Sequence, residues 1–171
     1  KAPILPRTDE DPFGTGSVYV LRESELSWKM WYTSFTDWGE KGSPKHKYCI
    51  KYAESTDGIN WQRSDTVCIG YQDESEYAIC RPSVIKLDNR YHMWFAARGD
   101  RYSIGYANSN DGINWERDLS YQFNVPKQGF NSDEMTYPYV FMHAGELYMI
   151  FAGNDYGNAG IGLAVLKGSL S

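Results

Sequence analysis

The sequence contains one phrase twice: Tyr52-Ala53-Glu54-Ser55-Thr56-Asp57-Gly58-Ile59-Asn60-Trp61 and, 54 residues later, Tyr106-Ala107-Asn108-Ser109-Asn110-Asp111-Gly112-Ile113-Asn114-Trp115. Internal similarity at a period near fifty residues is typical of repeat architectures. In such proteins one supersecondary unit is copied and stacked, so that neighbouring units bury each other's apolar faces. The period therefore decides the fold before any single residue does.

Aligning the copies predicts the same run of strands in each unit. The inner strands are 16–21, 81–87 and 137–142, the aromatic strands are 29–34, 92–97 and 148–153, and the third strands are 49–53, 103–107 and 160–165. In the first two copies Asp-Gly predicts a type I′ turn, whose two central residues both need positive φ. A fourth strand that opens with Ile-Asn-Trp is expected after that turn. Each unit is therefore predicted to be a four-stranded antiparallel meander.

A small four-stranded antiparallel sheet repeated at this period is one blade of a β-propeller, so the predicted fold class is all-β. The predicted blades cover 13–69, 80–126 and 135–168 of a single propeller unit. Residues 1–12 are expected to be the tail of a preceding outer strand. Three blades do not close a ring. The sequence therefore predicts part of a five-bladed propeller, or a ring completed by several copies of the chain.

Composition excludes several classes of function. The chain has 171 residues, a net charge of −5 and no run of Lys or Arg, which argues against nucleic acid as a partner. No apolar stretch has the length of a membrane helix. Three cysteines at spacings without a zinc pattern favour reduced, buried thiols over disulfides or a metal site. Unpaired thiols favour the cytoplasm, and localisation otherwise stays open.

Carboxylates precede each inner strand, and in a propeller these loops gather at one mouth of the central channel. The sequence alignment places Val18, Val84 and Val140 at equivalent positions. Asp11 and Asp133 each lie seven residues before their valine, and Glu76 lies eight residues before Val84. Converging acids suit glycoside hydrolysis, in which one protonates the leaving oxygen and another acts as base or nucleophile. The alternative is that they are solvated loop acids. The candidate catalytic residues are Asp11, Glu76, Asp133 and Glu134.

Polar and aromatic residues near the same mouth are candidates for binding a saccharide. They are Arg81, Arg98, Tyr137 and Asn154. The arginines could equally pair with loop acids, and the Asn154 segment has an ordinary turn composition. Asp57 and Asp111 of the repeated phrase are interpreted as turn residues whose carboxylates bind their own backbone. The tryptophans of that phrase are interpreted as packing residues.

Three sequence features together resemble the five-bladed propeller superfamily of glycoside hydrolase families 32, 43, 62 and 68. They are Ser-x-Asp-Gly-Ile-Asn-Trp, Arg-Pro-Ser-Val before an aromatic Met-Trp-Phe strand, and a terminal Gly-Ile-Gly-Leu-Ala. The resemblance spans nearly the whole chain. It implies three acids near the channel: a base or nucleophile from the first blade, a second acid that tunes or binds, and a glutamate acid from a later blade.

The sequence also departs from that superfamily. It holds about three blades, and it lacks the Arg-Asp-Pro and Glu-Cys motifs of the family 32 enzymes. Asp11-Pro12 and Glu76 correspond to the superfamily's acids by position only.

The sequence thus predicts a glycoside hydrolase-like protein that acts on or binds a carbohydrate at the axial mouth. Glu76 or Glu134 is the expected general acid and Asp11 or Asp133 the expected base, and that mechanism needs no cofactor or metal. The competing interpretation is a non-catalytic carbohydrate-binding or self-assembling propeller module. Because an incomplete ring exposes strand edges and apolar faces, the expected partners besides carbohydrate are further copies of the chain or the remainder of a longer propeller.

Overall fold

The computed structural model describes residues 2–42, 45–121, 123, 125–167 and 170. These residues form strands joined by turns, with a single 3-10 turn, η1 (Asp155–Gly157), and no α-helix among them. The prediction of an all-β chain is confirmed. Within the same described ranges, no helix is long and apolar enough to cross a lipid bilayer.

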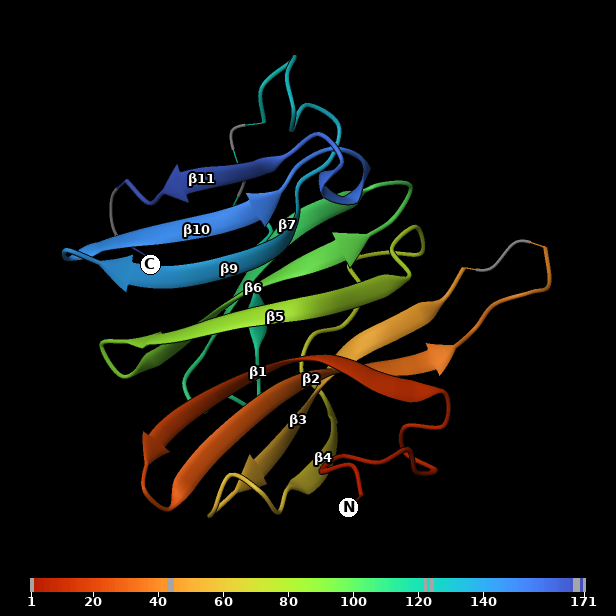
Figure 1. Cartoon of the computed structure of the whole chain (residues 1–171), viewed down its shortest axis with the longest axis vertical. Coiled ribbons are helices and arrows are strands. Elements are labelled where there is room, and N and C mark those ends of the chain that lie inside the picture. The colour runs from red at the N-terminus through yellow and green to blue at the C-terminus, as the bar shows by residue number, and fades with distance from the viewer. Residues whose placement is uncertain (1, 43–44, 122, 124, 168–169, 171) are drawn as a thin grey trace.

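The strands follow one another in three antiparallel meanders, which lie one above the other in Figure 1. The first comprises β1 (Gly14–Ser24), β2 (Ser27–Asp37), β3 (Lys47–Ser55) and β4 (Gln62–Val67). The second comprises β5 (Ala78–Leu87), β6 (Arg90–Arg98), β7 (Tyr102–Ser109) and β8 (Glu116–Arg117). The third comprises β9 (Thr136–His143), β10 (Glu146–Ala152) and β11 (Ile161–Val165). The predicted inner, aromatic and third strands lie within these elements, except that Gly153 and Gly160 each lie one residue outside.

Side chains, rather than backbone hydrogen bonds, hold the meanders together. The first and second meanders share a single parallel bridge, Tyr48 with Ala78. The third meander is a separate three-stranded sheet. Each meander therefore has two faces: a preceding-side face, directed towards the meander before it in the sequence, and a following-side face, directed towards the next one.

The core lies between these faces. Between the first two meanders, Trp31, Ile50 and Tyr52 of the following-side face pack against Val84, Met93 and Phe95 of the preceding-side face, and all six are buried. The Trp31 indole also donates a hydrogen bond to the Gly112 carbonyl at 2.8 Å. Between the second and third meanders the corresponding residues are Trp94, Ile104 and Tyr106 against Val140, Met149 and Phe151. Large aromatic rings in every interface explain the high aromatic content.

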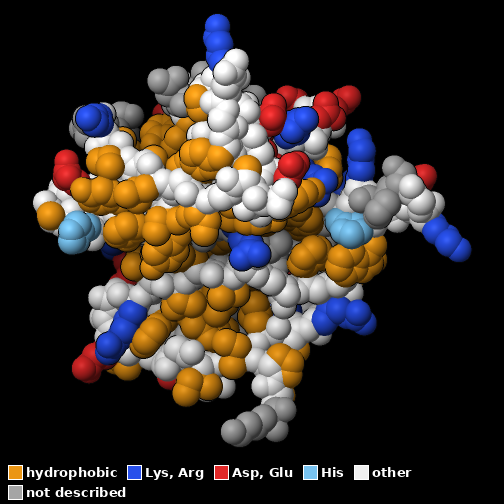
Figure 2. All heavy atoms as spheres, turned by 45° about the horizontal axis from the view of Figure 1, so that its top comes forward, with side chains coloured by type: hydrophobic (Ala, Val, Ile, Leu, Met, Phe, Trp, Pro, Cys, Tyr) orange, Lys and Arg blue, Asp and Glu red, His pale blue; other side chains and the backbone are white. Residues whose placement is uncertain are grey.

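Within the described ranges, the third meander has no such neighbour on its following-side face. Ile150, Ile161 and Leu163 are exposed there. Figure 2 turns this end of the molecule towards the viewer and shows apolar side chains gathered over it.

Each inner strand has a β-bulge near its start, and the strand pairing shows that the predicted alignment of the inner strands was wrong. Pairing places Tyr19 opposite Trp31, Ser83 opposite Trp94 and Tyr139 opposite Ile150. Val20, not Val18, is therefore equivalent to Val84 and Val140. The sequence alignment was wrong by two residues because it assumed loops of equal length before each strand. Asp11 consequently lies nine residues before its aligned valine, whereas Asp133 lies seven before.

The repeated phrase forms a longer loop than a two-residue hairpin. Gly58 has φ 72° and Gly112 has φ 78°, but neither preceding aspartate has positive φ, so the type I′ prediction was wrong. The Asp57 carboxylate instead accepts the backbone N–H groups of Ile59 at 2.8 Å and Asn60 at 2.7 Å. Asp111 makes the equivalent bonds. The interpretation of both aspartates as turn residues is confirmed, and the fourth strands begin only after the tryptophan.

The N-terminal segment, residues 2–13, covers part of the preceding-side face of the first meander. Leu5 packs on Met30, Tyr32 and Ala53. No strand forms within this segment.

The three cysteines are free and buried, as the reduced-thiol interpretation expected. Burial raises the pKa of the Cys80 thiol to about 11.

Candidate functional site

Two predicted binding residues occupy the same position in successive meanders. Arg81 and Tyr137 both lie in the bulge of an inner strand, and each has a φ of 55°. A non-glycine residue in this left-handed region costs on the order of 1–3 kcal/mol, and such strain is concentrated at functional sites. Bulges also re-aim side chains beside active sites. Here the result is that the Arg81 guanidinium lies 4.7 Å from the centre of the Tyr137 ring.

Arg98, at the end of β6, lies among three tyrosine rings. Its guanidinium carbon is 5.1 Å from the ring centre of Tyr102 and 5.7 Å from those of Tyr77 and Tyr156. The Arg98 Nε is buried and has no hydrogen-bond partner within the described ranges. Nor does any described carboxylate form an ion pair with it. A guanidinium without a carboxylate partner, against aromatic faces, is suited to an oxyanion of a ligand.

Glu134 anchors two of those rings through the backbone. Its carboxylate accepts the N–H of Tyr102 at 3.2 Å and the N–H of Tyr156 at 3.1 Å. Asn154 in turn accepts the N–H groups of Asp133 and Glu134 at 2.9 Å each. Glu134 and Asn154 therefore position the aromatic surroundings of Arg98.

Asp133 is exposed, and among the described residues its carboxylate accepts a hydrogen bond only from the Ser132 hydroxyl, at 3.4 Å. Of the four candidate acids, it is the one whose oxygens are not held by a cation or by several N–H donors.

Asp11 is bonded entirely within the first meander. Its fully buried carboxylate accepts hydrogen bonds from Tyr32 at 3.0 Å and Ser34 at 2.5 Å. It also pairs with Arg63 at 3.0 Å and Lys51 at 3.4 Å. These contacts tie the N-terminal segment to β2, β3 and β4.

Glu76 is bonded to the fourth strand of the second meander. Both of its oxygens accept the guanidinium of Arg117, at 2.6 and 2.8 Å, and one also accepts the Gln72 N–H at 2.8 Å. This planar two-bond pairing fixes the loop before β5.

The structure thus gathers five of the eight predicted residues into one connected group, which we call the mouth group. The Tyr102 ring is 6.0 Å from that of Tyr137 and so links Arg81 to Arg98. The mouth group consists of Arg81, Arg98, Tyr137, Glu134 and Asn154 together with Tyr77, Tyr102 and Tyr156. Among the described residues, the carboxylates of Asp11 and Glu76 form no hydrogen bond or ion pair with the mouth group, and Asp133 touches it through Asn154.

Sequence reasoning missed the three tyrosines of the mouth group. The sequence contained one signal for Tyr102, because Tyr48 lies 54 residues before it and so occupies the same position in the preceding repeat. Their hydroxyl groups form a hydrogen bond in the buried centre of the molecule. Burial raises the pKa of both phenols, so the pair stays protonated at neutral pH.

A cleft of about 380 Å³ runs along β7 and adjoins the mouth group. It shares Tyr102 and Glu134 with that group. Further lining residues are Tyr106, Tyr121, Arg117, Asp118 and Asp133. Flat rings beside carboxylates and a guanidinium are the kinds of groups that contact sugar rings and hydroxyls.

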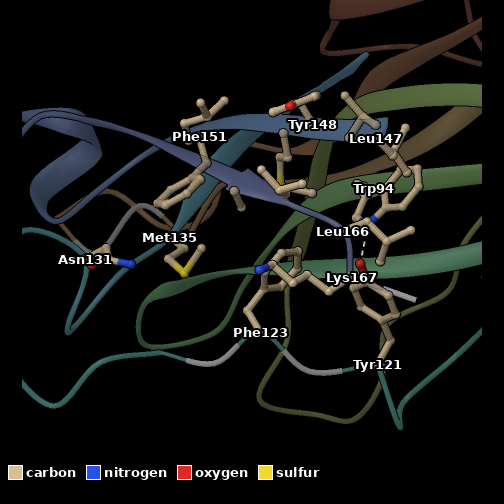
Figure 3. A pocket seen from close by; sticks show the side chains of 15 residues that line it. Trp94, Tyr121, Phe123, Asn131, Met135, Leu147, Tyr148, Phe151, Leu166 and Lys167 are labelled. Carbon is tan, nitrogen blue, oxygen red and sulfur yellow. Dashed lines mark hydrogen bonds between the residues drawn. The ribbon is translucent and has the colours of Figure 1, made fainter. Parts of the chain in front are cut away.

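A second hollow of about 360 Å³ lies between the second and third meanders (Figure 3). Its walls are mainly apolar, with Trp94, Met135 and Phe151 facing into it, and the Trp94 indole donates to the Tyr121 hydroxyl at 3.3 Å. None of the eight predicted site residues lines this hollow. It is an incompletely filled part of the interface between meanders rather than a place for acid–base chemistry.

Comparison with known proteins supports the fold and identifies sequence relatives. No protein-family model matches the chain. The uncharacterized protein Rv1502 of Mycobacterium tuberculosis (strain ATCC 25618 / H37Rv) is 38% identical over 167 residues, which are 96% of this chain and 55% of that protein. A beta-1,2-mannobiose phosphorylase of Thermoanaerobacter sp. (strain X514) is 30% identical over 114 residues, 63% of this chain and 38% of the enzyme. The chain spans about half the length of the first relative.

Solved structures agree with the resemblance found in the sequence. A thermostable family-43 glycoside hydrolase superimposes with a TM-score of 0.77 at 16% identity, over 99% of this chain and 58% of the enzyme. Glycoside hydrolases of families 117 and 32 also match over part of their chains. The chain therefore matches part of the fold of the five-bladed propeller glycoside hydrolases, and the predicted resemblance is confirmed at the level of the fold.

Proposed function

We propose that the chain is part of a carbohydrate-processing β-propeller whose substrate binds in the mouth group and the adjoining cleft. In this proposal the three meanders are blades, and further blades complete the ring. The fold likeness to glycoside hydrolases and the similarity to a mannobiose phosphorylase support a saccharide as ligand. The observation that carries the proposal is Arg98, a guanidinium in an aromatic setting with no carboxylate partner in the described part of the chain.

Arg98 and Arg81 favour inorganic phosphate as the second substrate. In phosphorolysis a phosphate oxygen forms the new bond to the anomeric carbon while the glycosidic C–O bond breaks. One carboxylic acid gives its proton to the departing oxygen, so the protein needs a single acid rather than an acid and a base. Asp133 is the proposed acid, because its carboxylate is exposed beside the mouth group and, in the part of the chain that the structure describes, accepts a hydrogen bond from Ser132 alone.

Hydrolysis by paired carboxylates is less well supported by the same geometry. Asp11 and Glu76 are each bound to cationic side chains of a single meander. Glu134 has both oxygens occupied by backbone N–H groups. Because the carboxylates of these three acids are already bound by other groups of the protein, the same geometry also supports a second candidate function. In that function the chain is a module that binds carbohydrate without catalysis.

The first experiment measures binding and the second measures turnover, because the chain spans only part of its longer relatives. Titration calorimetry with inorganic phosphate and with β-1,2-mannobiose is expected to show binding, and Arg98→Gln is expected to weaken phosphate binding at least about tenfold. The matched control is Arg101→Gln, an exposed arginine three residues away.

Release of a sugar 1-phosphate from mannobiose and phosphate would support phosphorolysis. Binding of the disaccharide without turnover by the chain would support the non-catalytic module. The proposal fails if neither compound binds, or if Arg98→Gln binds phosphate as the unaltered chain does.

A further inference from the structure

Trp38, directly after β2, differs from the other tryptophans of the chain. Each of the others donates a hydrogen bond within the protein from its indole N–H; they are Trp28, Trp31, Trp61, Trp94 and Trp115. Among the residues that the structure describes, the Trp38 N–H has no acceptor, and the residue is 45% exposed. A surface indole of this kind can offer a ligand both a flat ring and a hydrogen-bond donor.

Neighbouring rings hold Trp38 in place. Its ring stacks on that of Phe35, with centres 5.1 Å apart and an angle of 29° between the planes. Two further rings meet it at nearly right angles, Phe13 at 6.5 Å and His46 at 5.1 Å. Offset-stacked and edge-to-face contacts are the favourable arrangements of aromatic rings. We call the ordered surface formed by Phe13, Phe35, Trp38 and His46 the rim platform.

Gly39 allows the β2–β3 connection to approach itself closely beside Trp38. Its φ is 73°, and a Cβ at this position would lie 2.6 Å from the backbone N of Lys45. Only glycine accepts both conditions without strain. Lys45, held there, places its Nζ 5.4 Å from the centre of the Tyr77 ring. Because Tyr77 belongs to the mouth group, the connection that carries Trp38 touches that group directly.

Strand register places the rim platform at the same end of its meander as the mouth group. Phe35 pairs with Tyr48 as Arg98 pairs with Tyr102, so Phe35 is the first meander's equivalent of Arg98. β2 and β6 accordingly end on the same side of the molecule in Figure 1. Phe35 and Tyr77 also pack against one buried cluster that contains Tyr48 and Tyr102. The rim platform and the mouth group therefore adjoin.

We propose that the rim platform is a second sugar-binding subsite, which receives a further sugar unit of an oligosaccharide bound in the mouth group. This inference rests on the proposed function. Ligand sites combine aromatic walls with a few polar groups that fix orientation. Here exposed rings can cover the C–H face of a sugar, while the Trp38 N–H and the His46 ring can bond its hydroxyl groups. The chain should therefore bind an oligosaccharide more tightly than a disaccharide.

Titration calorimetry with β-1,2-mannobiose and β-1,2-mannotriose tests the subsite. The unaltered chain is expected to bind the trisaccharide more tightly. Trp38→Leu keeps an apolar side chain but removes the flat ring, and is expected to weaken trisaccharide binding by about tenfold. Binding of the disaccharide should stay unchanged, and Trp38→Phe should keep most of the trisaccharide affinity.

Trp28→Leu is the matched control, because Trp28 lies at the other end of β2 and its N–H is bound to the Glu25 carbonyl. Its affinities for both saccharides should equal those of the unaltered chain. If Trp38→Leu loses its circular dichroism spectrum, Phe13→Leu takes its place, since Phe13 is a second exposed ring of the rim platform.

The subsite is disproved if the unaltered chain binds both saccharides equally, or if the platform variant binds the trisaccharide as the unaltered chain does. An equal loss of affinity for both saccharides would also disprove it, because that result indicates a structural role. If the unaltered chain binds neither saccharide, the proposed function fails together with the subsite. If the disaccharide binds and phosphate binding responds to Arg98→Gln, but trisaccharide binding does not respond to Trp38→Leu, only the subsite fails.

Discussion

Asp11 is a predicted catalytic residue whose carboxylate is bound within a buried ionic network. Its carboxylate lies between two cations, Arg63 and Lys51, and two hydroxyl groups, in a position closed to water. Removing one member of a buried ionic network leaves its partners uncompensated. Asp11 therefore has a structural role that any catalytic assay of its variants must separate from catalysis.

Asp11→Ala is expected to lower the free energy of unfolding by about 3–5 kcal/mol, because two cations lose a buried partner. Urea denaturation followed by tryptophan fluorescence measures the change. Asp9→Ala is the matched control, an exposed acid of the same segment whose loss should cost less than about 0.5 kcal/mol. Equal midpoints for the two variants would show that the Asp11 network adds little stability.

At the scale of elements, the strands were predictable and their irregularities were not. A repeated period and alternating apolar residues located all three meanders. The positive φ of Arg81 and Tyr137 was not predictable, because a proline follows each and proline normally keeps its predecessor in extended conformations, although a proline within a strand does itself indicate a bulge or an edge. The Asp-Gly loop was misjudged because side-chain bonding from Asp57 replaces the two-residue turn.

These loops make stability depend on pH. The N–H groups of Asn60 and Ile59 hold the pKa of the Asp57 carboxyl well below its usual range. For Asp111, burial opposes the shift, but the Asn114 side chain and backbone outweigh it and lower the pKa. A depressed native pKa stabilises the fold fully above the unfolded value of about 3.9, and that stabilisation is lost as pH falls below it.

The urea midpoint is therefore expected to fall between pH 6 and pH 3, and to fall less in Asp57→Asn than in the unaltered chain. Asp65→Asn is the control, because Asp65 is exposed and makes no hydrogen bond in the described part of the structure. A pH dependence in Asp57→Asn identical to that of the unaltered chain would contradict the assignment.

At the scale of the whole molecule, the site depended on contacts that sequence spacing does not encode. The loops before the inner strands were correctly expected to hold Asp11, Glu76 and Glu134, but each carboxylate is fixed by a partner from another segment. Arg98 meets Tyr156 across 58 positions of sequence, through a loop whose fold depends on Asn154. The fold could be predicted because the strands repeat with a regular period. The contacts of the site could not, because they depend on the paths of loops whose sequences do not repeat.

The stacked arrangement of the meanders also predicts that local stability differs between inner and outer strands. β6 is almost wholly buried and paired on both edges, while β11 alternates between exposed and half-buried residues and pairs only with β10 among described strands. Amide hydrogens of β6 are expected to exchange at least about tenfold more slowly than those of β11. Mass spectrometry after exchange measures this. Uniform exchange along the chain would refute the gradient.

The Tyr48–Tyr102 hydroxyl contact constrains how this protein can change in length. The two residues occupy the same place in successive units, and they touch each other. Inserting a further copy of the unit that carries Tyr102 would recreate the contact between the new neighbours, whereas deleting that unit would bring Ala159, the equivalent residue of the third meander, to the position of Tyr102. Inserting one residue within β3 or β7 would shift the strand register and separate the phenols. Viable length variants of this protein should therefore gain whole units or change length in the loops, where the units already differ.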